Sequence, residues 1–347
     1  MRDGDWLLGY SSYDNYPGAS LTFGREDSGL YCLGEPDVSF GDMDLADAPL
    51  PGEDGIRMGR DYQRNATVTF ELGVDGNAGP VDLHWPMRPW KSGNPVGGWA
   101  STEAVLAAWN KRDQGPYQWG LDGLNMLRQV WRADALRGGA GRAGWLVHGT
   151  AGRTRQLYGR PRKFAVSHSR LSRQGYTPVV CEFAAVDDRF YEQEEKDVEL
   201  YDHRLGVQPP RPGRTSGAGW TFDSKKSATF QQKGTENTYP YIQFYGPCKN
   251  PKLTVGPSLW AVQLSVSIAA GDHVTIDARP WMRTAIHYQG ATSKSVADKL
   301  TRSSPRLSQM FIPPGYWSAS MSFSALGSHV ITGPRLRMAW RDAYSWW

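Results

Sequence analysis

A segment rich in proline and glycine, GVQPPRPGRTSGAGW at 206–220, is the feature that most limits how this chain can fold. Proline removes backbone N–H donors and glycine has no side chain to pack, so this composition excludes a helix and weakens any strand. The chain has 347 residues, which exceeds the usual size of a single hydrophobic core. We therefore expect two domains, 1–206 and 207–347, that meet at this segment.

The first half contains one clear strand, from Ala66 to Leu72, in which apolar and polar side chains alternate. A period of two places one set of side chains on a buried face and the other in water. The residues expected in the core are Ala66, Val68, Phe70 and Leu72, and those expected in water are Thr67, Thr69 and Glu71. The other apolar runs of this half are short and are broken by Gly, Pro and Ser, which predicts a split-barrel-like β domain.

Helical patterns are few. A short helix is expected at 101–113, where Ser101 or Thr102 can cap the N-terminus, and 124–137 also has helical character. In the second half, 265–277 reads as two strands joined at Ala270–Asp272, and the spacing of further short strands predicts an antiparallel sandwich. The expected fold class is therefore mainly β.

Composition argues against several classes of protein. There are 39 basic and 35 acidic residues, a formal charge of +4, whereas a dedicated nucleic-acid binder usually shows a stronger, clustered excess. No run of about eighteen apolar residues occurs, so we expect no membrane insertion, and the N-terminus lacks a signal-peptide profile, so we expect folding in a cytoplasm. The three cysteines have no ligand spacing and are interpreted as reduced core thiols.

No motif for catalysis or cofactor binding stands out. GAGRAG at 139–144 matches GxGxxG, but the helical pattern precedes it and the strand pattern follows it, the reverse of a dinucleotide-binding loop. The seven histidines are scattered without paired ligand spacing. We therefore expect no enzyme activity, no cofactor and no metal, and interpret 139–144 as a connector.

A basic segment, GRTRQLYGRPRKF at 152–164, needs an explanation. Its cations are spaced two apart at Arg153 and Arg155 and again at Arg160 and Arg162, with Lys163 following, so on a strand each pair shares one face. Guanidinium groups in such a row suit carboxylates of a neighbouring chain. Protein contact ranks above nucleic-acid binding because few aromatic residues lie nearby, and an ordinary solvated hairpin is a further alternative.

The order of several short motifs resembles the distal tail proteins of siphophages, as found in phages of actinobacteria. Over about residues 35–200 the resemblance rests on DGIRMGRDYQRNATVTFELGV, VLAAWNKRD, GRTRQLYGRPRKF and VVCEFAAVDDRFYE. In the second half it rests on YIQFYGPCKNPKL, AAGDHVTIDARPWMRTAIHYQG and FIPPGYWSASMSFSA. DDRFY at 187–191 departs from the Asp-Pro form expected after the last strand of the N-terminal domain.

This resemblance implies a structural virion protein at the tail tip, with a ring-forming N-terminal domain and a galectin-like C-terminal sandwich. The ring, typically hexameric, would join the tail tube to the tip and contact the tube protein, the hub protein and the tape measure protein. A ring of identical subunits needs two different patches that meet head to tail. The residues expected at this contact are Arg153, Arg155, Arg160, Arg162 and Lys163, with Glu192, Glu194 and Glu195 as acidic partners.

Two other functions stay open. A sandwich with many aromatic residues can bind carbohydrate, so contact with a host cell-wall glycan is the main alternative; the aromatic residues considered are Trp260, Trp281, Tyr288, Trp317 and Trp340. Aromatic residues in a sandwich are more often part of its core. A wall hydrolase ranks third, because no catalytic constellation supports it.

Overall fold

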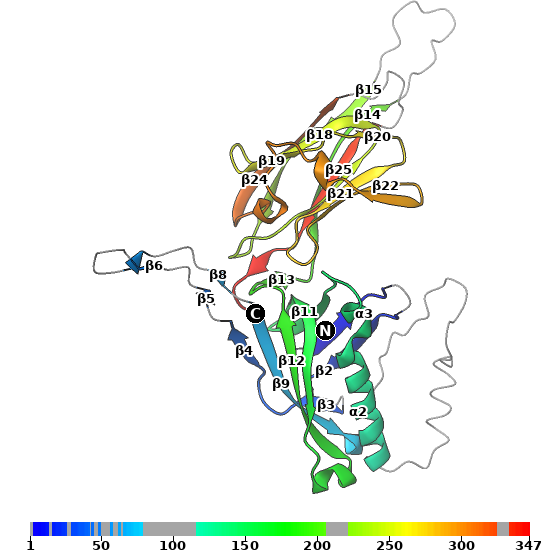
Figure 1. Ribbon diagram of the computed structural model, residues 1–347, viewed down its shortest axis with the longest axis vertical. Coiled ribbons are helices and arrows are strands. Elements are labelled where there is room, and N and C mark those ends of the chain that lie inside the picture. The colour runs from blue at the N-terminus through cyan, green and yellow to red at the C-terminus, as the bar shows by residue number, and fades with distance from the viewer. Residues whose placement is uncertain are drawn as a thin grey trace, which may run out of the picture. The chain divides into compact units, whose positions relative to one another are not determined.

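The computed structural model divides the chain into two compact units, Met1–Phe190 with Trp347, and Tyr191–Trp346 (Figure 1). It describes residues 3–13, 16–25, 29–41, 43–44, 48–49, 56–57, 62–63, 65–78, 116–205, 221–324 and 333–347. The helix expected at 101–113 and the segment 206–220 lie outside these residues.

The first unit is a sheet with one main helix. Its strands are β1 (Trp6–Tyr10), β2 (Ala19–Phe23), β3 (Leu30–Cys32), β4 (Asp37–Phe40), β5 (Met43–Asp44), β6 (Ala48–Pro49), β7 (Ile56–Arg57), β8 (Tyr62–Gln63), β9 (Ala66–Asp75), β10 (Gly144–Thr150), β11 (Arg153–Val166) and β12 (Tyr176–Ala185). Its helices are η2 (Gly76–Ala78), α2 (Pro116–Arg132), α3 (Asp134–Arg137) and η3 (Arg170–Gln174), and β13 (Phe190–Glu192) lies at the division.

The main sheet of this unit curls toward closure. Its strand order is β2-β1-β10-β11-β12-β9-β3, and every pair along this path for which a register is described is antiparallel. The backbone N–H of Gly24 donates to the carbonyl of Leu30 at 2.9 Å, and that of Cys32 donates to the carbonyl of Gly24 at 3.2 Å. These bonds join the two ends of the path, so the sheet is barrel-like, and the expectation of a mainly β fold is confirmed.

Phe70 lies at the centre of the core of this unit. Its ring meets those of Trp6, Phe23 and Trp131 edge to face, with centroids 4.9, 5.2 and 6.1 Å away. Trp131 comes from α2, whose apolar face packs on the sheet and whose polar face is exposed. The alternation predicted for β9 is confirmed: the four apolar side chains are fully buried, whereas Thr67 and Thr69 are half-buried and Glu71 is exposed.

A second aromatic cluster in this unit includes a histidine. The imidazole of His148 stacks on Trp6 with centroids 4.0 Å apart, and the ring of Trp347 meets both edge to face. His148 Nδ1 lies 3.2 Å from the carbonyl oxygen of Asp5. Burial lowers the pKa of His148, since a charged imidazole loses hydration here, and the Asp5 carbonyl and the charge of Asp3 oppose that shift in part.

The second unit is a two-layer sandwich. The strands of its two layers are β14 (Lys196–Leu205), β15 (Thr221–Lys225), β16 (Ser227–Gln232), β17 (Tyr241–Tyr245), β18 (Cys248–Val255), β19 (Trp260–Gln263), β20 (Ser267–Ile268), β21 (His273–Asp277), β22 (Thr284–Gln289), β23 (Thr292–Ser295), β24 (Gly315–Ser324) and β25 (Arg335–Trp340). A further short strand, β26 (Ala343–Tyr344), pairs with β13. The short helices are η4 (Ala297–Lys299) and η5 (Leu307–Gln309).

Seven strands form one layer in the order β15-β14-β25-β17-β21-β22-β23, and β16-β24-β18-β19 with β20 form the other. One apolar cluster combines side chains of both layers, such as Phe244 and Leu336 from the first and Leu253 and Val262 from the second. The two strands expected within 265–277 are β20 and β21, and Gly271 between them has a φ of +88°. Glycine suits this turn because a Cβ is strained at positive φ.

The division between the units lies before the boundary expected at 206/207. β14 pairs with β25, from Lys196 opposite Trp340 to Tyr201 opposite Arg335, so the structure places 196–205 in the second unit. A high density of proline and glycine indicates where the backbone cannot form strand pairs. It does not indicate where one hydrophobic core ends and the next begins. The functional domains proposed as 1–206 and 207–347 remain a prediction.

Substitution of Phe70 tests the core of the first unit. We expect Phe70→Ala to lower the free energy of unfolding by about 3 to 5 kcal/mol, because it removes a fully buried ring and leaves a cavity. Thr69→Ala, on the opposite face of β9, is the control and should cost less than about 1 kcal/mol. Urea unfolding measures both, and equal losses would contradict the register of β9.

The environment of His148 predicts a dependence of stability on pH. Its pKa is lower in the folded than in the unfolded chain, so the unfolded chain binds a proton first as the pH falls below about 6.5. The folded state should therefore lose stability in that range, and His148→Phe, which keeps a ring on Trp6 but cannot titrate, should lose less. Urea midpoints are measured for both proteins from pH 7 to 5, and a parallel decrease of the midpoint in wild type and in His148→Phe would contradict this prediction.

Candidate assembly surface

The basic segment forms β11, whose neighbours fix where each cation lies. β11 pairs with β10 from Gly159 opposite Gly144 to Arg153 opposite Thr150, without a register shift. Leu157 belongs to the core cluster, so odd-numbered positions of this strand face inward and even-numbered positions face outward. The two arginine pairs therefore lie on opposite faces of the sheet, and they do not form one row.

The inner pair is largely unavailable for contact with a partner. Arg155 is 8 % exposed and lies opposite His148 in the sheet. Arg153 is exposed at the start of β11, directly after the turn at Ala151 and Gly152, where both residues have positive φ. Of this pair, Arg153 can reach a neighbouring molecule.

Arg160, on the outer face, donates hydrogen bonds within its own chain. Its Nε donates to the carbonyl oxygen of Arg142 at 2.5 Å, and its Nη2 donates to that of Gly139 at 2.7 Å. Burial lowers the pKa of the Arg160 guanidinium, and the charges of Arg162 and Arg142 lower it further. Arg160 therefore holds the loop that contains GAGRAG, the segment interpreted as a connector between helix and strand.

Arg162 and Lys163 lie at an irregularity of the sheet. The register between β11 and β12 shifts between Pro161 and Phe164, and both basic residues are exposed there. Lys163 Nζ lies 2.9 Å from Glu182 Oε1 on β12. For Arg162 no carboxylate partner is found within the described part of the chain, so its guanidinium is available to another molecule.

The three glutamates lie in the second unit: Glu192 ends β13, and Glu194 and Glu195 follow it. Glu192 Oε2 is 3.7 Å from Lys196 Nζ, and Lys196 also pairs with the buried carboxylate of Asp342. Glu195 Oε1 lies 2.9 Å from Arg337 Nη2. Glu194 is exposed, and no cation pairs with it among the residues described. Within the described residues, the expected site thus reduces to three exposed charges for which no ion-pair partner is found: Arg153, Arg162 and Glu194.

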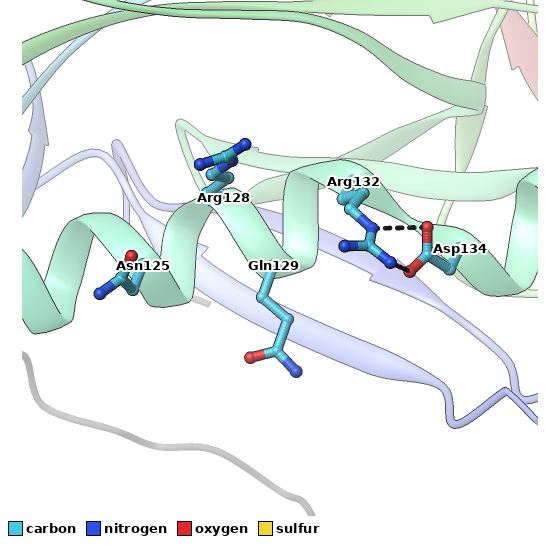
Figure 2. A pocket seen from close by; sticks show the side chains of 5 residues that line it. All are labelled: Asn125, Arg128, Gln129, Arg132 and Asp134. Carbon is cyan, nitrogen blue, oxygen red and sulfur yellow. Dashed lines mark hydrogen bonds and ion pairs between the residues drawn. The ribbon is translucent and has the colours of Figure 1, made fainter.

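Helix α2 adds a polar surface that the sequence did not single out as a site. Figure 2 shows a depression lined by Asn125, Arg128, Gln129, Arg132 and Asp134. Arg132 holds Asp134 in a bidentate pair, with Nε to Oδ1 at 2.8 Å and Nη2 to Oδ2 at 2.5 Å, which lowers the pKa of Asp134. The sequence pattern that indicates this surface is the spacing of polar residues three and four apart within 124–137, which places them on one face of a helix.

The described residues contain no group of three or more His, Cys, Asp or Glu side chains arranged to hold a metal ion. All three cysteines are free thiols; Cys181 and Cys248 are buried and Cys32 is half-buried. Burial raises the pKa of Cys32 to about 11 and that of Cys248 to about 12, so both resist forming the reactive thiolate. None of the helices in the described ranges is long and apolar enough to cross a membrane.

No family model matches the chain, and no curated protein matches it. Among solved structures, it is similar to chains of phage assemblies. Two are structures of the phage p2 baseplate in its activated conformation. The one with Sr is 11 % identical with a TM-score of 0.44, the one with Ca is 10 % identical with a TM-score of 0.41, and each comparison covers 96 % of this chain and 97 % of that one.

A further similar structure is that of SPP1 Dit (gp 19.1), described as a paradigm of the hub adsorption apparatus in phages that infect Gram-positive bacteria. It is 9 % identical with a TM-score of 0.43, and the comparison covers 90 % of this chain and 91 % of that one. These three structures are of phage proteins, a baseplate in two cases and Dit in the third.

Replacement of Arg160 tests its role in the loop. Arg160→Gln should lower the free energy of unfolding by about 1 to 3 kcal/mol, because two carbonyl oxygens lose charge-assisted hydrogen bonds. Arg170→Gln, at an exposed position of η3, is the matched control and should change stability by less than about 0.5 kcal/mol. Urea unfolding measures both variants. An unchanged free energy of unfolding in Arg160→Gln would contradict a structural role of Arg160 in the loop.

Proposed function

We propose that this chain is a structural protein of a phage tail, a distal tail protein whose copies form a hexameric ring between the tail tube and the tip. The observation that carries the proposal is the ordered set of motifs that resembles distal tail proteins. Three of those motifs fall on strands and turns of the described residues: 152–164 on β11, 179–192 on β12 and β13, and 269–290 on β21 and β22; VLAAWNKRD at 105–113 lies outside those residues. The role is architectural, with no catalytic step.

The charges on the two units support a head-to-tail contact. Arg162 lies on the outer face of the first unit, and Glu194 is exposed in the second. A heterologous interface joins two different patches of identical subunits, and a ring results when the rotation closes. In this proposal Arg162 of one copy pairs with Glu194 of the next, Arg153 is a further contact, and Arg155, Arg160, Glu192 and Glu195 support the surface from within each chain.

The neighbours in the virion follow from the same resemblance. One side of the ring would meet the tube protein, and the other would meet the hub and tape measure proteins at the tail tip. The segment 207–347, proposed to be galectin-like, would then be an appended module, because the charged residues proposed for the ring contact all lie before it.

Charge reversal in the full-length protein tests the ring. Wild type should form a defined oligomer by light scattering, Arg162→Glu should reduce it to smaller species, and Glu194→Arg added to Arg162→Glu should restore it because the pair is re-formed with exchanged signs. The control is Arg302→Glu, an exposed arginine in the second unit. A monomeric wild type, or an Arg162→Glu oligomer of unchanged mass, would refute the assignment.

A further inference from the structure

The outer face of the seven-stranded sheet carries a row of residues that crosses the entire sheet. One residue comes from each strand, and each is directly opposite the next in the hydrogen-bond register. In strand order the row is Lys225, Tyr201, Arg335, Tyr245, His273, Tyr288 and Ser293. Basic residues and tyrosines alternate from Lys225 to Tyr288, a span of about 24 Å at the usual distance between strands. We call these seven residues the cross-sheet row.

The side chains of the row are organised and accessible. The Arg335 guanidinium carbon lies 4.5 Å from the ring centroid of Tyr245. The rings of His273 and Tyr288 are stacked, with centroids 4.8 Å apart and planes at 13°. Lys225 and Ser293 are exposed, and the five members between them are partly exposed. The row therefore presents ordered cations and phenol groups at the surface.

The row contains no acidic residue, and two acidic residues near it, Glu195 and Asp197, are paired with Arg337. Arg337, two positions after Arg335, lies 2.9 Å from Glu195 and 3.3 Å from Asp197. Arg335 itself has no carboxylate partner among the described residues, and its contact with Tyr245 leaves guanidinium N–H groups unused. The positive charge of Lys225 and Arg335 is thus available to an anionic ligand.

We propose that the cross-sheet row binds an acidic saccharide chain laid across the strands. Carboxylate or phosphate groups of the saccharide would contact Lys225 and Arg335, and its hydroxyl groups would bond to tyrosine hydroxyls and to the imidazole of His273. Tyrosine hydroxyls on this face already form side-chain hydrogen bonds: Tyr245 Oη, in the row, donates to Gln243 Oε1 at 3.0 Å, and Gln243 Nε2 donates to Tyr241 Oη at 3.2 Å. This surface is independent of the proposed ring.

Ring geometry favours a saccharide over single-stranded nucleic acid. Nucleic-acid bases need open ring faces on which to stack. Here His273 covers one face of Tyr288, and Arg335 covers one face of Tyr245, so ring edges and hydroxyl groups are what the surface mainly offers. A protein partner usually needs large apolar anchors, but the exposed large hydrophobic residues described in this unit, Met282, Tyr316 and Trp346, lie outside the row.

Calorimetry with full-length protein at low ionic strength tests the proposal. The probes are a hexamer of galacturonic acid, its neutral methyl ester, a mannose oligosaccharide that carries one phosphate, and an eight-residue oligothymidylate. At least one acidic saccharide should bind, and removal of its charge should weaken binding at least about tenfold. The two acidic probes show whether carboxylate or phosphate is preferred.

Variants locate the binding to the row. Arg335→Gln and Tyr288→Phe should each weaken binding at least about fivefold, whereas Arg302→Gln and Tyr316→Phe should leave it within about twofold. Tyr316, 79 % exposed on β24 of the other layer, is the matched tyrosine control. If Arg335→Gln fails to fold, Lys225→Gln at an exposed position makes the same test.

Several results would overturn the proposal. These are no binding of either acidic saccharide at about 10 mM, equal binding of the methyl ester, equal losses in the control variants, and tighter binding of oligothymidylate than of both saccharides. The last result would assign the row to nucleic acid. A failure here would leave the oligomerisation experiment with Arg162 and Glu194 unaffected, because the two tests use different residues and different measurements.

Discussion

Antiparallel register is the constraint on which both surfaces depend. A slip of one residue in β11 would turn Arg160 and Arg162 inward and bring Leu157 to the outside, and the core would lose a fully buried side chain. In the second unit, the same rule places Phe244 and Leu336 inside, so their neighbours Tyr245 and Arg335 must lie outside. The apolar cores thus determine which charged groups reach solvent.

One strand and one turn were predictable from the sequence, because the residues that determine them are neighbours in the chain. The strand at 66–72 alternates over seven consecutive residues, and burial from Ala66 to Leu72 follows that pattern. The turn at Gly271 was similarly marked by residues next to it. The boundary near Phe190 was not, because β14 is assigned to the second unit by its pairing with β25, more than a hundred residues later in the chain.

The candidate sites also depend on residues that are distant in the sequence, and a local pattern does not predict how these come together. The spacing of Arg153, Arg155, Arg160 and Arg162 predicted two pairs, each on one face of a strand. It could not show that the pairs lie on opposite faces of a sheet with one buried side, or that Arg160 donates to the carbonyl oxygens of a loop near position 140. The cross-sheet row draws one residue from each of seven strands, so no stretch of sequence contains it.

Arginine illustrates why net charge alone says little about partners. Arg160 is used by backbone carbonyls, Arg337 by two carboxylates, and Arg335 lies over a tyrosine ring. A guanidinium satisfied by its own chain must lose those bonds before it can serve another molecule, whereas one that contacts a ring keeps its in-plane donors. Selective recognition therefore requires basic residues whose donors remain unused, and Arg335 is such a residue, in a row that contains no acidic side chain.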